Sequence, residues 1–152
     1  MIDPEIEAFV QRIHQDIPLT HAMGWQIENI DKDQLNASAP LLPNINDKGT
    51  FFGGASAALM TISAWSLIKY HLEQLGLTND VVIHKSQNQW LRPQQDVMQI
   101  HCTFDSPVDW SAVQRRLLGQ QKTQHLKVVT QGSAGAVVTG TMKANYVILP
   151  KK

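Results

Sequence analysis

The sequence has very little cysteine and no excess of charge of either sign. Cys102 is the only cysteine, which excludes an internal disulfide framework and a zinc site built from several cysteines. Lysine and arginine total 13, as do aspartate and glutamate, so no overall electric field favours nucleic acid or an anionic membrane as a partner. The first residues lack the basic head and apolar core of a signal peptide. We therefore expect a cytoplasmic protein that binds no metal, no nucleic acid and no membrane.

A second absence is local, because residues 50–68 contain no charged side chain. The run is about long enough to cross a bilayer, but it includes Gly53, Gly54 and several hydroxyl side chains, and no second segment of this kind exists. A helix that is apolar on all sides can equally be buried inside a protein. The run therefore predicts a buried helix within a single domain, residues 1–152, which is long enough to form its own core.

Hydrophobic periodicity predicts the remaining elements. An amphipathic helix opens the chain, and residues 24–41 form a hairpin whose turn lies near residues 31–33. The uncharged run predicts a long helix over residues 53–75, which Gly76 ends. Four strands follow, interrupted by one short helix that Asp109 caps and Gly119 ends. In the last strand, two sets of residues alternate and are expected on opposite faces of the sheet. The apolar set is Val138, Met142, Tyr146 and Ile148, and the polar set is Thr139, Thr141, Lys143 and Asn145.

This order of elements predicts an α+β fold. A strongly curved antiparallel sheet that wraps around one long central helix would bury the helix on most of its sides. Such an arrangement explains why the helix has no charge, since a buried charge without a partner is costly.

The entry to the long helix carries the motif N-x-x-G-T-x-x-G-G, formed by Asn46, Gly49, Thr50, Gly53 and Gly54. Together with the order of elements and the sequence WLRP at residues 90–93, this motif resembles the hot-dog fold of acyl-thioester enzymes. More narrowly, residues 39–68 are similar to the YiiD C-terminal family of thioesterase-like proteins, and the similarity extends over essentially the whole chain. That family includes malonyl-acyl-carrier-protein decarboxylases, either free-standing (the MadB type) or fused to an acetyltransferase domain, which has no counterpart here.

The resemblance implies an assembly and a substrate class. Hot-dog proteins form dimers with active sites between the subunits, so we expect a homodimer, and the short sheet has edges that invite pairing. The substrate would be an acyl thioester of acyl carrier protein or coenzyme A, so phosphopantetheine arrives with the substrate and the protein binds no cofactor of its own. Candidates for a docking patch for an acidic carrier are Arg115, Arg116, Lys122 and Lys143.

The start of the long helix is the candidate catalytic site. A helix N-terminus presents unpaired backbone N–H groups with partial positive charge, and Gly53 and Gly54 let a ligand come close because neither has a Cβ. Such a site suits a thioester carbonyl oxygen that becomes an oxyanion or enolate. Asn46 adds an amide that can donate to this oxygen or orient a carboxylate, and the resemblance favours a catalytic role for it. The residues alone favour the alternative that Asn44 and Asn46 simply build the turn.

Neighbouring residues complete the predicted substrate site. Asp47 is the nearest carboxylate, Phe51 and Phe52 are predicted to wall the pocket or a subunit interface, and Arg92 is predicted to meet a phosphate or an acid of the carrier. The full set predicted to bind substrate is Asn44, Asp47, Gly49, Thr50, Phe51, Phe52, Ser56 and Arg92.

The long helix offers no general base. Thioester hydrolysis needs a water activated by a carboxylate or a histidine, yet residues 50–68 contain neither. Decarboxylation of a malonyl thioester needs only hydrogen-bond donors for the enolate, and a dry pocket weakens hydration of the leaving carboxylate. The sequence therefore favours malonyl-acyl-carrier-protein decarboxylation, which supplies acetyl carrier for fatty-acid synthesis. Two alternatives stay open: hydrolysis, with Asp47 or a residue of the other subunit as the base, and non-catalytic binding of acyl thioesters.

Overall fold

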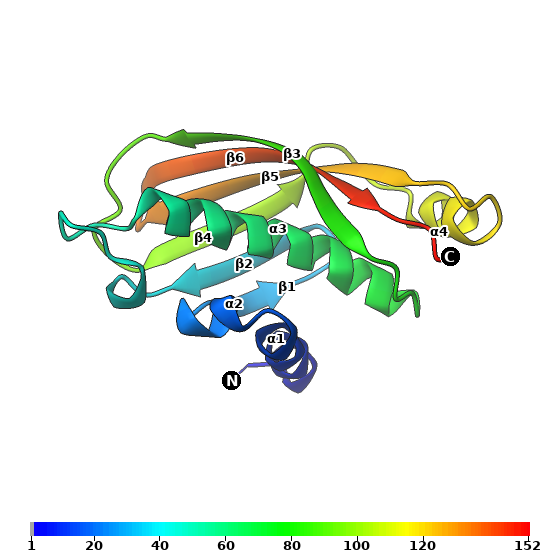
Figure 1. Ribbon diagram of the computed structural model, residues 1–152, viewed down its shortest axis with the longest axis horizontal. Helices are drawn as coiled ribbons and strands as arrows, with labels where there is room; N and C mark the ends of the chain where they lie inside the picture. Colours follow the sequence, from blue (N-terminus) through cyan, green and yellow to red (C-terminus); the bar gives the residue numbers. More distant parts are fainter. Residues whose placement is uncertain (1) are drawn as a thin grey trace.

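The computed structural model describes residues 2–152 as one antiparallel sheet with a long helix packed on it (Figure 1). The helices are α1 (Pro4–Asp16), α2 (Pro18–Ala22), α3 (Gly53–Gln74) and α4 (Trp110–Leu118), with one 3₁₀ turn, η1 (Leu42–Asn44). The strands are β1 (Gln26–Ile30), β2 (Gln34–Ala39), β3 (Val81–Trp90), β4 (Met98–Phe104), β5 (Gln124–Ala134) and β6 (Val137–Ile148). The predicted hairpin, long helix, short helix and four later strands are confirmed.

The sheet is antiparallel throughout and has the strand order β1-β2-β4-β5-β6-β3. Figure 1 shows α3 lying across one side of the sheet, which we call the inner face, and the opposite side is the outer face. The predicted alternation holds in β4, where Met98, Ile100 and Cys102 are almost fully buried and their neighbours are more exposed. β3 is an edge strand, so one side of its backbone has no strand beside it in this chain.

Three hydroxyl side chains of α3 are satisfied by the backbone of the helix itself. Thr61, Ser63 and Ser66 each donate a hydrogen bond of 2.7 Å to the carbonyl oxygen four residues earlier. Trp25, which is fully buried, donates from Nε1 to Ser63 Oγ at 2.9 Å. Trp65 belongs to a stripe of the helix that stays half-buried, so coverage of α3 is incomplete within one chain. Within residues 2–152, no helix combines the length and the hydropathy needed to span a bilayer.

The inner face of β6 differs from the prediction at the start of the strand. The alternation predicts Thr139 on the same face as Thr141 and Lys143, but Thr139 is buried with 5% of its surface exposed. The pairing shifts here, because Gly140 lies opposite Gly132 and the next pair joins Val138 to Ser133. Thr139 is therefore the extra residue of a bulge, which turns its side chain inwards.

Candidate functional site

The loop between η1 and α3 folds into a small closed turn. Backbone hydrogen bonds of 2.7 Å join Asn46 N to Thr50 O and Phe52 N to Asn44 O. Gly49 takes a φ of 79° within this turn, a left-handed conformation that glycine adopts without a steric penalty. The N-x-x-G part of the motif is therefore explained by the backbone of the turn.

The side chain of Asn46 fills the interior of the turn. Its Oδ1 accepts hydrogen bonds from the backbone N–H groups of Lys48 (2.8 Å) and Thr50 (3.1 Å). Its Nδ2 donates to Thr50 Oγ1 (2.9 Å) and to the carbonyl oxygen of Phe51 (3.2 Å). Both hydrogens of the amide are thus engaged inside the loop, as the turn-building alternative describes.

Asn44 anchors the same loop to the rest of the protein. Only 3% of its surface is exposed. Its Nδ2 donates to the carbonyl oxygens of Met23 (2.9 Å) and Pro40 (2.8 Å), which lie just after α2 and β2. These contacts give Asn44 a structural role in this chain.

The first turn of α3 has no side-chain cap, because its N-cap residue Phe52 makes no side-chain hydrogen bond there. Two aromatic rings lie beside the glycines of this turn. Trp90 Nε1 donates to the carbonyl oxygen of Gly53 at 3.1 Å. A Cβ on Gly53 would lie 3.2 Å from Trp90 Nε1, and one on Gly54 would lie 2.6 Å from Cε2 of Phe52. The glycines therefore make room for Trp90 and Phe52 at the start of the helix.

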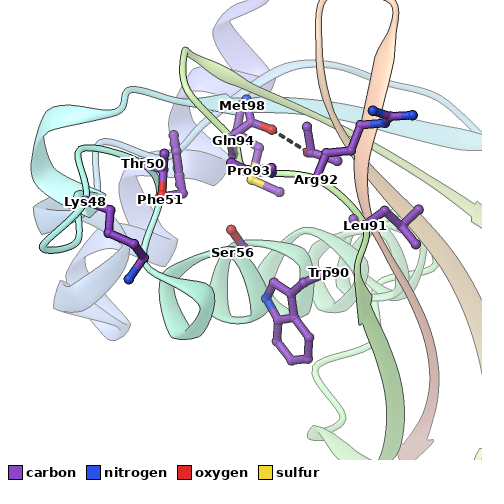
Figure 2. A pocket seen from close by; sticks show the side chains of 12 residues that line it. Lys48, Thr50, Phe51, Ser56, Trp90, Leu91, Arg92, Pro93, Gln94 and Met98 are labelled. Carbon is purple, nitrogen blue, oxygen red and sulfur yellow. Dashed lines mark hydrogen bonds between the residues drawn. The ribbon is translucent and has the colours of Figure 1, made fainter.

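A cavity of about 310 Å³ lies beside this turn (Figure 2). It is enclosed by the loop before α3, by the connection between β3 and β4, and by the first part of β6. Its lining residues are Lys48, Thr50, Phe51, Ser56, Trp90, Leu91, Arg92, Pro93, Gln94, Met98, Thr139 and Gly140.

Gln94 joins the three segments that enclose the cavity. It is 4% exposed, and its Nε2 lies 3.0–3.3 Å from the carbonyl oxygens of Asp96, Val97 and Ser133. Its Oε1 accepts a hydrogen bond from the hydroxyl of Thr139, drawn as a dashed line in Figure 2. The backbone carbonyl of Gln94 also accepts a hydrogen bond from the backbone N–H of Phe51, at 2.9 Å. One buried glutamine therefore fixes the cavity wall on three sides.

Two hydroxyl groups of the cavity can donate to a ligand. Ser56 is 6% exposed, and Figure 2 shows its side chain directed into the cavity. Unlike the hydroxyls of Ser63 and Ser66, which bond to the carbonyl four residues earlier, the Ser56 hydroxyl has no hydrogen bond within residues 2–152. Thr50 Oγ1 accepts from Asn46 Nδ2, which leaves the hydrogen of the Thr50 hydroxyl free.

The charged groups that line the cavity are cations. Lys48 and Arg92 belong to the lining, whereas no aspartate, glutamate or histidine of residues 2–152 does. Asp47 is fully exposed, and the Lys48 ammonium, 2.8 Å from Asp47 Oδ1, holds the pKa of that carboxyl below its usual value. A lowered pKa makes the carboxylate a weaker base. Figure 2 shows the Arg92 guanidinium extending away from the centre of the cavity.

The strongly perturbed groups of the protein lie outside the cavity lining. Burial raises the pKa of the Cys102 thiol to about 12, so this thiol is not a nucleophile at neutral pH. Burial also lowers the pKa values of His14 and His71. In the described part of the chain, no group of three or more histidine, cysteine or acidic side chains is placed to hold a metal ion.

The cavity brings together some of the predicted site residues. Those in the lining are Thr50, Phe51, Ser56 and Arg92. Those outside it are Asn44, Asn46, Asp47, Gly49, Phe52, Gly53 and Gly54. Lining residues missing from the predicted site are Lys48, Gln94, Met98, Thr139 and Gly140, together with three of the WLRP residues. The position of Gln94 directly after WLRP is the signal that points to it.

Comparison with known proteins decides the family. The sequence profile described as "Putative thioesterase (yiiD_Cterm)" matches residues 6–150. The chain belongs to the YiiD C-terminal family. This match covers the turn around Asn46, the cavity and every strand of the sheet.

Solved structures share the architecture of this YiiD C-terminal protein. A "putative thioesterase" from Shewanella oneidensis is 22% identical, with a TM-score of 0.83 over 95% of this chain and 97% of that one. A protein of unknown function from Chlorobaculum tepidum is 19% identical, with a TM-score of 0.82 over 95% and 94% of the two chains. A "Probable Thioesterase" from Pseudomonas aeruginosa is 15% identical, with a TM-score of 0.77 over 99% of each chain. The predicted hot-dog fold is confirmed.

Proposed function

We propose that this protein acts on acyl thioesters, and that it decarboxylates malonyl-acyl carrier protein to acetyl-acyl carrier protein, as the MadB type does. The acetyl carrier would then start fatty-acid synthesis in the cytoplasm. The observation that carries this proposal is the lining of the cavity, which combines hydroxyl groups and cations but holds no carboxylate or imidazole from residues 2–152. Hydrolysis would require such a base, whereas the bond-breaking step of decarboxylation does not.

Hydrogen-bond donors are sufficient for this reaction. The thioester carbonyl oxygen would lie within reach of the hydroxyls of Thr50 and Ser56, which line the cavity. The bond between the α-carbon and the carboxylate breaks, carbon dioxide leaves, and the electron pair passes to the carbonyl oxygen as an enolate. Water then protonates the α-carbon and yields the acetyl thioester. These donors stabilise the enolate more than the uncharged carbonyl, which lowers the barrier.

In this proposal Asn46 acts through Thr50. Asn46 Nδ2 donates to Thr50 Oγ1, so it fixes the position of that oxygen and leaves the hydroxyl hydrogen for the substrate. A hydrogen bond received by a hydroxyl also strengthens the one that it donates. We therefore still propose that turnover depends on Asn46. In this proposal Asn46 contacts Thr50 of the cavity lining, and not the substrate as the sequence suggested.

The cations at the cavity would hold the negative charges of the substrate. Arg92 is exposed and extends away from the centre of the cavity, which suits the phosphate of the phosphopantetheine arm. Lys48 is paired with Asp47 at the surface. Phe51 and Met98 form apolar walls that would weaken hydration of the leaving carboxylate.

Product analysis separates the candidate activities. The protein is incubated with malonyl-acyl carrier protein and, separately, with malonyl coenzyme A, and the products are identified by mass spectrometry. We expect the acetyl thioester and carbon dioxide. Release of a free thiol would instead identify a hydrolase, and an unchanged substrate that binds the protein would identify a non-catalytic binder.

Hydrolysis is the second candidate, favoured by the names of two similar solved structures, each called a thioesterase. It would need a base from outside the described lining of the cavity. Asp47 is the nearest candidate in sequence, but its exposure and its pair with Lys48 make it a weak one. A residue of a second subunit is the other candidate.

We further propose that the protein is a homodimer formed along β3. This edge strand of ten residues exposes 43% of both Val82 and Ile83. Ile83 also lines an apolar hollow of about 310 Å³ with Trp65 of the half-buried stripe on α3. A long exposed edge beside an apolar surface is a site for pairing with another strand. Analytical ultracentrifugation is expected to give twice the chain mass of 17.0 kDa, and a monomer at micromolar concentration would contradict this.

A further inference from the structure

Acidic residues are nearly absent from the sheet. All 13 aspartates and glutamates lie in helices, in loops or in β1, and the strands β2 to β6 contain none. The same five strands carry Lys85, Lys127 and Lys143. The chain as a whole has no net charge, but its acidic residues lie almost entirely outside the sheet, while three of its lysines lie on the sheet.

Strand register places these lysines together on the outer face. Asn145 of β6 pairs with Lys85 of β3 on one side and with Lys127 of β5 on the other. Lys143 lies two residues before Asn145 and therefore on the same face. The three lysines are exposed and line one shallow hollow of about 210 Å³, together with Gln87 and Asn145. We call Lys85, Lys127 and Lys143 the lysine cluster.

No carboxylate of residues 2–152 neutralises the lysine cluster. The ion pairs in this part of the chain join Arg12 to Glu73 and Lys48 to Asp47. Lys127 also borders a neighbouring hollow that contains Asp105 and Asp109, whereas the hollow that Lys85, Lys127 and Lys143 share has no acidic residue in its lining. Three ammonium groups around such a hollow produce a positive potential that attracts an anionic partner and speeds its association.

The residues of the predicted docking patch are spread over several elements. Lys143 belongs to the lysine cluster, whereas Arg115 and Arg116 lie on α4. Arg116 lines a neighbouring hollow of about 600 Å³ that shares Lys127 and Asn145 with the hollow of the lysine cluster and also contains Asp105 and Asp109. Those carboxylates weaken the attraction of an anion beside Arg116 and Lys127, so the positive surface is strongest at Lys85 and Lys143.

We propose that the lysine cluster is the docking site for the acidic carrier protein that presents the acyl group. This inference rests on the proposed function of the cavity. Thr139 and Gly140 of β6 line the cavity and lie three or four residues from Lys143, a distance of about 10–13 Å along the strand. A carrier bound at the lysine cluster would therefore sit beside the exposed Arg92, where its phosphopantetheine arm enters the cavity.

An acidic protein fits this face better than two other occupants. A second copy related by a two-fold axis, as in a homodimer, would bring the same cluster against itself, and juxtaposed like charges are costly. Nucleic acid binding rests on many phosphate contacts, but the chain has no net positive charge. Pairing of two β3 strands would leave the cluster free, because side chains stand perpendicular to the plane of the sheet.

Binding of holo-acyl carrier protein tests the docking site independently of the reaction. The test variant is Lys85→Glu/Lys127→Glu/Lys143→Glu, and the matched control is Lys32→Glu/Lys151→Glu/Lys152→Glu, which changes the net charge equally at exposed residues outside the cluster. We expect the test variant to bind the carrier at least about tenfold more weakly at low salt, and the control to bind like the wild type. If the glutamate variant does not fold, Lys85→Gln/Lys127→Gln/Lys143→Gln replaces it, and we expect an intermediate loss of carrier affinity.

Four results decide the proposal. A selective loss in the test variant, with turnover of malonyl coenzyme A retained, supports docking at the lysine cluster. Equal losses in the test and control variants would overturn it, because only the net charge would then matter. A wild-type protein that binds no carrier, or that binds DNA or anionic vesicles through the same lysines instead, would also overturn it. If carrier binding follows the lysines but no acetyl thioester forms, the docking site stands and the decarboxylation proposal fails.

Discussion

The Asn46→Ala variant is expected to turn over malonyl thioesters about 10²–10³-fold more slowly than the wild type, because the proposed oxyanion donor Thr50 would lose the contact that holds it in place, and one such donor is usually worth a loss of this size. The Asn46 amide fixes Thr50 Oγ1 and holds the carbonyl of Phe51 in the turn. Because Asn46 lies in a surface loop and is only half-buried, the fold is expected to persist. Steady-state kinetics with malonyl-acyl carrier protein measure the loss, and turnover close to the wild type would refute the assignment.

Two further variants test whether Asn46 acts through Thr50. Asn46→Asp keeps the oxygen that accepts from the backbone of Lys48 and Thr50 but puts a carboxylate oxygen where Nδ2 donates to Thr50 Oγ1 and to the Phe51 carbonyl. The Thr50 hydroxyl would then donate to the carboxylate, so turnover should be lost, and the repulsion from the Phe51 carbonyl should lower the melting temperature. Thr50→Val removes the proposed donor itself. If the two residues act in series, the double variant Asn46→Ala/Thr50→Val is no slower than the slower single variant. Losses that multiply would show that Asn46 and Thr50 act independently.

The second large effect is expected at Gln94, where Gln94→Leu should abolish activity and lower the free energy of unfolding by about 2–5 kcal/mol. Leucine would leave the carbonyls of Asp96, Val97 and Ser133 and the hydroxyl of Thr139 without their buried partner. Urea denaturation followed by circular dichroism measures the stability.

Gln95→Leu is the matched control, since Gln95 is the exposed neighbour of Gln94. The control should keep both stability and turnover, because it alters the surface only. If Gln94→Leu were as stable and as active as this control, Gln94 would have no role in holding the cavity wall.

The fold could be predicted because the strongest sequence signals coincide with its largest elements. The absence of charge from residues 50–68 marks α3, and strict alternation marks β2 and β4. The bulge at Thr139 could not be predicted, since one extra residue in a strand leaves no trace in composition and appears only in the pairing with β5. The short helix α2 is equally hard to see, because five residues do not establish a period.

The candidate site was predicted in its location but only partly in its members. The motif at the start of α3 led to Thr50, Phe51 and Ser56, which do line the cavity. The residues of the opposite cavity wall were not predicted. Gln94 acts there through hydrogen bonds to backbone carbonyl groups, one of them on the distant strand β5, and such contacts follow no spacing in the sequence. For Asn46, the sequence shows the amide but not the bonds that already occupy it.

The acid-free sheet has a consequence for the behaviour of the molecule in solution. The outer face carries positive groups, while α1 carries Glu5, Glu7 and Asp16 against a single arginine. A separation of positive and negative groups gives a neutral protein an electric dipole moment, so the approach of a charged partner is oriented before contact. Two copies can also meet head to tail, sheet against helix. Low ionic strength near the isoelectric point of about 7.0 therefore promotes reversible clustering, and added salt disperses it.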